Sequence, residues 1–151
     1  MKKIEIGFEL KDKCQKFRET CFGIVKTNNK FLCVLKDDTY SLIGGGIEQN
    51  ESELDCLKRE FLEEAGREIK SANKICIVDI YWKTRDNFIM HSLSNIYDVS
   101  ITSKQLEILE KEHTVVELTM EELLTKLPLP YQKKGVEVYL NNLTNRWFLN
   151  Y

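Results

Sequence analysis

The chain has 151 residues, which suits a single domain with its own hydrophobic core. Its net charge is −2, so the composition excludes a strongly basic surface for duplex nucleic acid. The N-terminus lacks the apolar stretch of a signal peptide, and no apolar run is long enough to span a membrane. Five scattered cysteines, with no CxxC pair, favour free thiols in a reducing compartment. We therefore expect one cytoplasmic domain over residues 1–151.

Strands dominate the first half of the expected fold. Runs rich in apolar and β-branched residues alternate with short polar turns, and a Thr-Asn-Asn turn between the first two runs indicates a hairpin. Two longer runs follow further along the chain, around a Lys-Thr-Arg-Asp turn. The segment 103–113 is polar and ambiguous. The expected strands are 18–26, 30–36, 39–43, 73–82, 87–101 and 114–118.

Three helices are expected among these strands. The first follows a triple glycine; Asn50 is predicted to cap it with Glu53 in a box-like pair, and Gly66 to end it in the left-handed conformation. Thr119 begins a capping box for the second helix, and the third is expected to start near Pro130. Strands mixed with three helices predict the α/β class around a mixed sheet.

The first helix carries an unusual group of glutamates. At about 100° per residue, Glu60, Glu63 and Glu64 occupy an arc beside the arc expected to face the core. A helix packed on a sheet would thus present these carboxylates to a cleft. The residues of the expected core arc are Leu54, Leu57, Phe61 and Ala65.

Such a group of carboxylates is unfavourable on its own. Like charges three and four residues apart repel each other, and Glu63 and Glu64 lie at the helix end where the dipole disfavours anions. A divalent cation removes the conflict because Mg²⁺ or Mn²⁺ binds carboxylate oxygens. Three glutamates on a helix more often form a solvated acidic face. The wider spacing decides between these two interpretations.

The residues around the glutamates follow a fixed spacing. This segment resembles the Nudix box, G-x5-E-x7-R-E-U-x-E-E-x-G-U, in which U is a bulky apolar residue. It departs only at the last position, where Arg67 replaces an apolar residue and Ile69 is expected to fill the apolar role. A phosphate-binding loop is a weaker interpretation of the glycines, because the ending G-K-[ST] is missing. The matching residues are Gly45, Glu51, Arg59, Glu60, Phe61, Glu63, Glu64 and Gly66.

The resemblance implies a Nudix α/β/α sandwich of the compact, MutT-like size, and it implies roles for individual residues. Glu60, Glu63 and Glu64 look like ligands of Mg²⁺ or Mn²⁺, with one of them helping to activate water. The carbonyl of Gly44 is a further candidate ligand, and Arg59 looks like the partner that orients a box glutamate. Three residues look structural: Glu51 at the helix start, and Gly45 and Gly66 as conformational glycines.

Candidates outside the box rest on weaker patterns. Family members often add an acidic residue from a late loop, for which Glu110 and Glu112 are the candidates, with Glu112 preferred for its closeness to the strand 114–118. Two ordinary loop charges are the alternative. Tyr81 and Trp82 are candidates for stacking on a base, although aromatic residues are common in any strand.

Nudix enzymes cleave a nucleoside diphosphate linked to another group. The resemblance therefore implies a metal-dependent hydrolase of a small-molecule nucleotide, and a MutT-like nucleoside triphosphate pyrophosphohydrolase is the first expectation. Hydrolysis of dinucleoside polyphosphates, ADP-ribose or nucleotide sugars is an alternative, as is a Nudix-fold sensor that binds a nucleotide without cleaving it. We expect a monomer or homodimer without a membrane partner.

Overall fold

The computed structural model describes residues 2–149, so the expected domain over 1–151 is described except at residues 1, 150 and 151. The strands are β1 (Lys2–Ile6), β2 (Lys16–Thr27), β3 (Lys30–Lys36), β4 (Thr39–Gly46), β5 (Arg67–Lys83), β6 (Ile89–Gln105) and β7 (Thr114–Leu118). The helices are η1 (Phe8–Lys13, 3₁₀), α1 (Glu53–Glu60), η2 (Phe61–Ala65, π), α2 (Met120–Lys126) and α3 (Pro130–Leu149).

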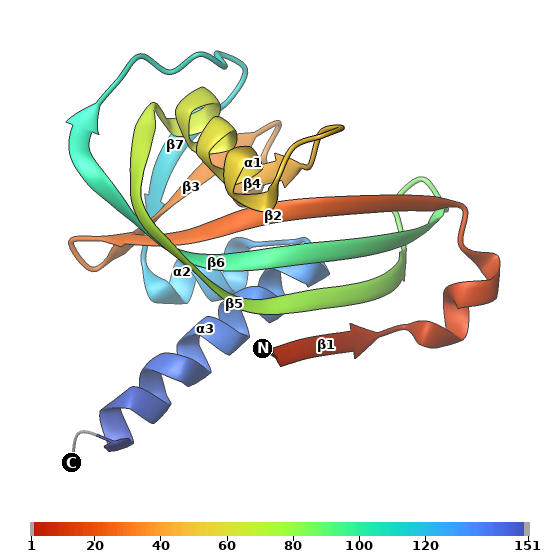
Figure 1. The fold of residues 1–151 in the computed structure, drawn as a ribbon. Coiled ribbons are helices and arrows are strands. Elements are labelled where there is room, and N and C mark those ends of the chain that lie inside the picture. Colours follow the sequence, from red (N-terminus) through yellow and green to blue (C-terminus); the bar gives the residue numbers. More distant parts are fainter. Residues whose placement is uncertain (1, 150–151) are drawn as a thin grey trace.

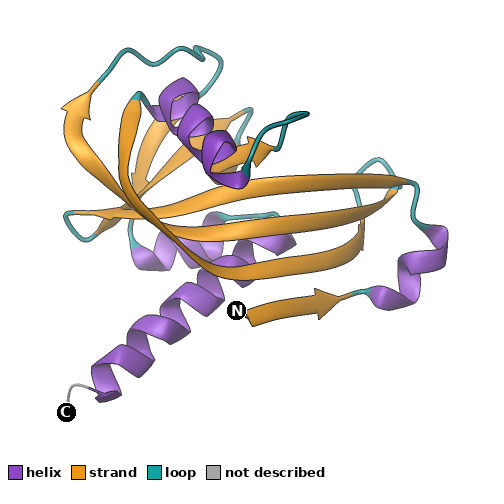
Figure 2. Ribbon diagram, in the orientation of Figure 1, coloured by secondary structure: helices purple, strands orange, loops and turns teal. Residues whose placement is uncertain are grey.

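The described strands form one mixed sheet in the order β1-β5-β6-β2-β4-β3-β7. The pairs β1–β5 and β2–β6 are parallel, and the other pairs are antiparallel. Helix α1 lies on one side of the sheet, and α2 and α3 lie on the other (Figures 1 and 2). This arrangement confirms the predicted α/β sandwich around a mixed sheet.

The six expected strands are all present, and most of them are longer than predicted. The largest difference is at β5 and β6, which begin earlier or end later than the apolar runs because exposed polar residues continue their pairing. Strand β4 extends through the triple glycine to Gly46. The sequence did not predict β1 or η1, because a short polar segment gives little periodicity and β1 is fixed by parallel pairing with distant β5.

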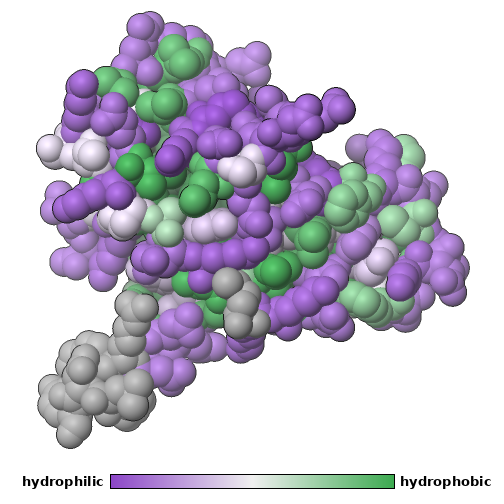
Figure 3. All heavy atoms as spheres, viewed as in Figure 1, coloured by the Kyte–Doolittle hydropathy of each residue, from purple (hydrophilic) through white to green (hydrophobic). Residues whose placement is uncertain are grey.

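Two hydrophobic clusters fill the spaces between the layers. The larger contains residues of the sheet and of α2 and α3, including Phe22, Ile96 and Tyr139. The smaller lies under α1 and includes Leu57 and Phe61. Figure 3 shows hydrophilic side chains over much of the surface around α1, with a group of hydrophobic side chains beside them. Within residues 2–149, no helix is both long and apolar enough to cross a membrane.

The start of α1 differs from the prediction. Ser52, not Asn50, caps the helix, because its side chain accepts a hydrogen bond from the backbone N–H of Asp55. Asn50 has a φ of 65° and belongs to the preceding turn. Leu54 is 45% exposed and does not join the core. Cys56 is buried in its place. Positions i and i+2 of a helix lie about 200° apart, so Leu54 and Cys56 cannot both face the sheet.

The end of the helix agrees with the prediction. Helix α1 continues directly into the π-helical turn η2, which contains Glu63 and Glu64. Gly66 follows with a φ of 61°, the left-handed conformation expected of a residue that ends a helix. π-Helical turns are uncommon and often occur at functional sites. The carboxylates of interest thus lie in and next to this irregular last turn.

Candidate metal and catalytic site

Glycines at the end of β4 allow close approach of the helix carboxylates. The backbone N–H of Gly44 donates a hydrogen bond to Glu64 Oε1 at 2.9 Å. A Cβ atom at Gly45 would lie only 2.5 Å from Glu60 Oε1, so a larger residue would displace this carboxylate. The triple glycine therefore brings the β4 backbone against two of the three box glutamates.

Arg59 connects the acidic residues of the helix with the loop before it. Its Nε and Nη2 atoms donate to the two carboxylate oxygens of Glu51, at 2.7 and 2.9 Å. Its Nη1 atom donates to Glu60 at 3.0 Å and to Glu63 at 3.2 Å. Its Nη2 atom also donates to the carbonyl of Gly46 at 3.1 Å. One guanidinium thus holds three carboxylates and the end of β4 in a fixed arrangement.

This network changes the acidity of the carboxyl groups. The hydrogen bond from Arg59 lowers the pKa of Glu51 to about 2. Burial, together with the nearby Glu60, raises the pKa of Glu64 to about 8 against the opposing hydrogen bond from Gly44. Burial likewise raises the pKa of Glu60, which Arg59 partly opposes. Glu60 and Glu64 are therefore carboxylates whose ionised form needs additional positive charge.

A fourth carboxylate comes from the loop after β6. Carboxylate oxygens of Glu60, Glu63 and Glu110 lie within 4.8 Å of one another. Glu112 instead makes an ion pair with Lys36 at 3.1 Å, and its side chain is 78% exposed. The preference for Glu112 is therefore corrected in favour of Glu110. Closeness to β7 was a poor guide because the path of the loop across α1 and η2 decides which residue reaches the site.

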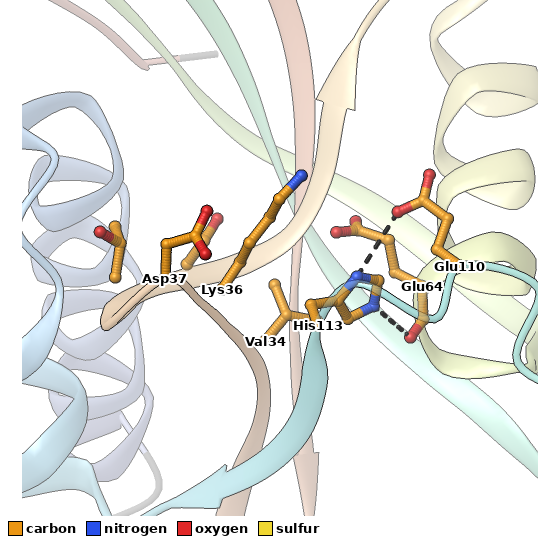
Figure 4. A pocket seen from close by; sticks show the side chains of 8 residues that line it. Val34, Lys36, Asp37, Glu64, Glu110 and His113 are labelled. Atoms are coloured by element: carbon orange, nitrogen blue, oxygen red, sulfur yellow. Dashed lines mark hydrogen bonds and ion pairs between the residues drawn. The ribbon is translucent and has the colours of Figure 1, made fainter.

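His113 lies behind this carboxylate. Its side chain is only 2% exposed, with Nδ1 3.5 Å from Glu110 Oε2 and Nε2 2.8 Å from the carbonyl oxygen of Glu64 (Figure 4). Atoms of Glu64, Glu110 and His113 also lie within 4.8 Å of one another. The sequence did not single out this histidine, since nothing in its local pattern marks it.

A pocket of about 320 Å³ opens beside these groups. Lys36 lines it opposite Glu64, Glu110 and His113, and Figure 4 shows these side chains around a shared space. The pocket thus combines carboxylates on one side with an ammonium group on the other. No pattern in the sequence marks Lys36, which ends β3 before an ordinary turn. The remaining lining residues are Val34, Asp37, Thr39 and Ser41.

The two aromatic candidates do not line this pocket. The ring of Tyr81 is 4.1 Å from the ring of His91 in a parallel stack, and Phe8 packs against it edge-on. Trp82 donates from Nε1 to Ser92 at 2.9 Å and packs near Tyr131. The stack with His91 leaves Tyr81 poorly placed to stack on a base, and Trp82 packs against the larger core cluster.

The one departure from the box lies away from the carboxylates. Arg67 donates from Nη1 to the carbonyl of Thr102 on β6 at 3.4 Å. Ile69 packs against the cluster under α1, as expected of the residue that replaces the missing apolar side chain. The substitution therefore places the Arg67 side chain against β6, at the start of β5.

The donor set fits a hard divalent cation. Glu60, Glu63 and Glu110 place carboxylate oxygens within 4.8 Å of one another, and the buried Glu64, which lies within the same distance of Glu110, would be costly to ionise without a cation. The guanidinium of Arg59 offsets part of the negative charge but already makes hydrogen bonds to Glu51, Glu60 and Glu63. Glu60, Glu63, Glu64 and Glu110 are the residues that could hold Mg²⁺ or Mn²⁺.

Comparison with protein families identifies this arrangement. The model of the NUDIX domain matches residues 18–139, which is most of the chain. The chain belongs to the Nudix family. It is therefore a Nudix hydrolase, of the class that acts on pyrophosphate bonds, and its acidic helix is the Nudix helix. Comparison with curated protein sequences finds no significant match.

Solved structures agree with this fold at low sequence identity. A NUDIX hydrolase from Nitrosomonas europaea is 18% identical, with a TM-score of 0.64 over 83% of this chain and 89% of that one. The MutT protein from Bacillus halodurans is 18% identical, with a TM-score of 0.66 over 80% of both chains. An ADP compounds hydrolase is also 18% identical, with a TM-score of 0.63 over 85% of this chain and 74% of that one. Such identities establish the fold and leave the substrate open.

Proposed function

We propose that this Nudix hydrolase is a MutT-like pyrophosphohydrolase of nucleoside triphosphates that depends on Mg²⁺ or Mn²⁺. One observation carries the proposal: Glu64 and Glu110 line a pocket with Lys36, and Glu60 and Glu63 place carboxylate oxygens within 4.8 Å of Glu110. A bound divalent cation neutralises phosphate charge and lowers the pKa of bound water. The side chains of the protein bind the cation, accept the proton of the attacking water and contact the phosphate.

The side chains divide this work according to their positions. Glu60, Glu63, Glu64 and Glu110 would hold the cation, with the Gly44 carbonyl as a further ligand. One of the ionised carboxylates accepts the proton of the attacking water. Lys36, across the pocket, provides an ammonium group for a phosphate oxygen.

Arg59 orients Glu60 and Glu63 through hydrogen bonds and does not contact the substrate. Glu51 and Gly45 support the loop and the close approach of β4, and Gly66 ends the helix.

The proposed substrate class rests on the small size of the domain and on its similarity to solved Nudix structures. A compact Nudix domain similar to a MutT protein supports a nucleoside triphosphate, and the similarity to an ADP compounds hydrolase keeps ADP-ribose as the second candidate. A cytoplasmic location belongs to the same proposal, which four buried free cysteines support. A monomer or homodimer acting on a small nucleotide, without duplex nucleic acid, completes it.

Turnover of a substrate panel tests the proposal. The purified protein is incubated with Mg²⁺ and nucleoside triphosphates, oxidised purine triphosphates, ADP-ribose, nucleotide sugars and dinucleoside polyphosphates, and products are separated by chromatography. We expect a nucleoside monophosphate and pyrophosphate from a triphosphate, and no product from the Glu64→Gln variant. Cleavage of ADP-ribose alone would replace the triphosphate assignment, and cleavage of none would contradict the proposal.

A further inference from the structure

The loop that brings Glu110 to the site has little hydrophobic attachment of its own. Residues 106–112 lie between β6 and β7, and most of them are exposed, including Leu109 at 64%. Glu110 itself has a side chain that is 47% exposed. The position of its carboxylate therefore depends on polar contacts that fasten the loop to the rest of the domain.

These contacts are made with the carbonyl end of the Nudix helix. The backbone N–H of Glu110 donates to the carbonyl of Glu63 at 2.9 Å, and the N–H of Leu106 donates to the carbonyl of Gly66 at 2.8 Å. The side chain of Gln105 donates to the carbonyl of Ala65 at 2.9 Å. Carbonyls at the end of a helix lack partners within it, and here the loop supplies them.

His113 supplies the remaining contact and is the buried member of the set. Its Nε2 lies 2.8 Å from the carbonyl oxygen of Glu64, and since a carbonyl only accepts, this nitrogen carries the hydrogen. The same ring places Nδ1 3.5 Å from the carboxylate of Glu110 (Figure 4). One imidazole thus contacts the backbone of one candidate ligand and the side chain of another.

We propose that His113 is a positioning residue, which fastens the loop carrying Glu110 to the end of the Nudix helix and thereby adds the fourth carboxylate to the cation site. The inference rests on the proposed function, because it assumes that Glu110 binds the cation. His113 acts through Glu110 and through the Glu64 carbonyl, and it contacts neither cation nor substrate. Residues that orient ligands in this way typically change metal affinity by about 10–100-fold when removed.

Mn²⁺ binding to the protein without nucleotide tests this role. The dissociation constant is measured by electron paramagnetic resonance of free Mn²⁺ for wild type, His113→Ala, Glu110→Gln and the double variant. We expect each single variant to bind Mn²⁺ about tenfold more weakly, and the double variant no more weakly than Glu110→Gln. Glu107→Gln on the same loop and His91→Gln are matched controls expected to bind as wild type does.

Hydrogen exchange in EDTA gives a second readout without metal or activity. We expect amides in residues 106–113 to exchange faster in His113→Ala, and His113→Gln to recover most of the protection because its amide N–H reaches the same carbonyl. Equal exchange and equal Mn²⁺ affinity in His113→Ala and wild type would overturn the proposal. So would additive losses in the double variant, which would show that His113 acts independently of Glu110.

The outcomes also separate this inference from the proposed function. A wild-type protein that binds Mn²⁺ and hydrolyses nucleotides, beside an unaffected His113→Ala variant, overturns only the role of His113. A wild-type protein that binds no Mn²⁺ overturns the cation site on which both proposals depend.

Discussion

Glu64 is the most deeply buried glutamate of the Nudix box. It is only 9% exposed, and its carboxylate accepts a hydrogen bond from Gly44. We expect Glu64→Gln to keep the fold and to reduce turnover by several orders of magnitude, because a ligand charge is lost from a group that acts together. Measurement of kcat in Mg²⁺ beside melting curves in EDTA checks this. Glu68→Gln, at an exposed carboxylate, is the control, and more than half of wild-type activity in Glu64→Gln would contradict the role.

The raised pKa of Glu64 predicts how the free energy of unfolding of the metal-free protein depends on pH. Burial raises the pKa of Glu64 from 4.5 to about 8. Between these values the folded protein binds a proton that the unfolded chain has released, so the free energy of unfolding falls as pH rises from 4.5 to 8. Urea unfolding in EDTA across this range is the measurement. Glu64→Gln should remove much of the decrease, and an identical pH dependence in both proteins would exclude Glu64 as its source.

Substitution of Arg59 is expected to change kcat more than KM. Lysine at this position cannot reproduce the paired hydrogen bonds to Glu51 while also reaching Glu60 and Glu63. We expect Arg59→Lys to lower kcat by about 10–100-fold, with a much smaller change in KM, because the carboxylates lose their orientation. Steady-state kinetics decide this, and a change confined to KM would instead indicate that Arg59 binds the substrate.

At the scale of elements, the contact between β4 and α1 makes a strong prediction. A Cβ at Gly45 would lie 2.5 Å from Glu60 Oε1, whereas a Cβ at Gly46 would meet only Arg18, at 3.4 Å. We therefore expect Gly45→Ala to weaken Mn²⁺ binding and turnover about tenfold or more, and Gly46→Ala to affect both much less. Equal losses in the two variants would show that backbone flexibility, not the approach of Glu60, matters at these glycines.

The elements also show where sequence reasoning succeeds. The six strands expected from runs of apolar and β-branched residues are all present in the structure. The fixed spacing of the Nudix box identified the helix that carries Glu60, Glu63 and Glu64. The helix cap was wrong by two residues because Asn50 adopts a left-handed turn, while Ser52 has the extended conformation of a cap. Such a choice depends on φ angles that the surrounding turn imposes, and two neighbouring residues with capping side chains look alike in a sequence.

The sequence did not predict the contacts between elements that are far apart along the chain. Glu110 and Glu112 are nearly equivalent in sequence, and only the hydrogen bonds from the loop to Glu63, Glu64 and Gly66 decide that Glu110 faces the site. Lys36 and His113 reach the pocket through the pairing of β3 with β7, which no local pattern reports. The stack of Tyr81 on His91 was likewise not predicted, since His91 comes from the neighbouring strand.

At the scale of the whole molecule, the site lies where several layers meet. The glycines come from β4, the glutamates from α1 and η2, Lys36 from the end of β3, and Glu110 from the loop between β6 and β7. A cation bound there would contact residues that are far apart in the unfolded chain. It should therefore stabilise the complete domain and not a single helix.

The melting temperature with added Mg²⁺ shows whether the acidic face of the Nudix helix is a cation site. A ligand that binds only the folded state at 100 times its Kd stabilises it by about 2.7 kcal/mol, which corresponds to about 5–10 °C for a domain of this size. We predict this rise in wild type, little rise with NaCl of equal ionic strength, and none in the Glu60→Gln/Glu64→Gln variant. If NaCl matches Mg²⁺ in wild type, these glutamates form only a screened, solvated surface.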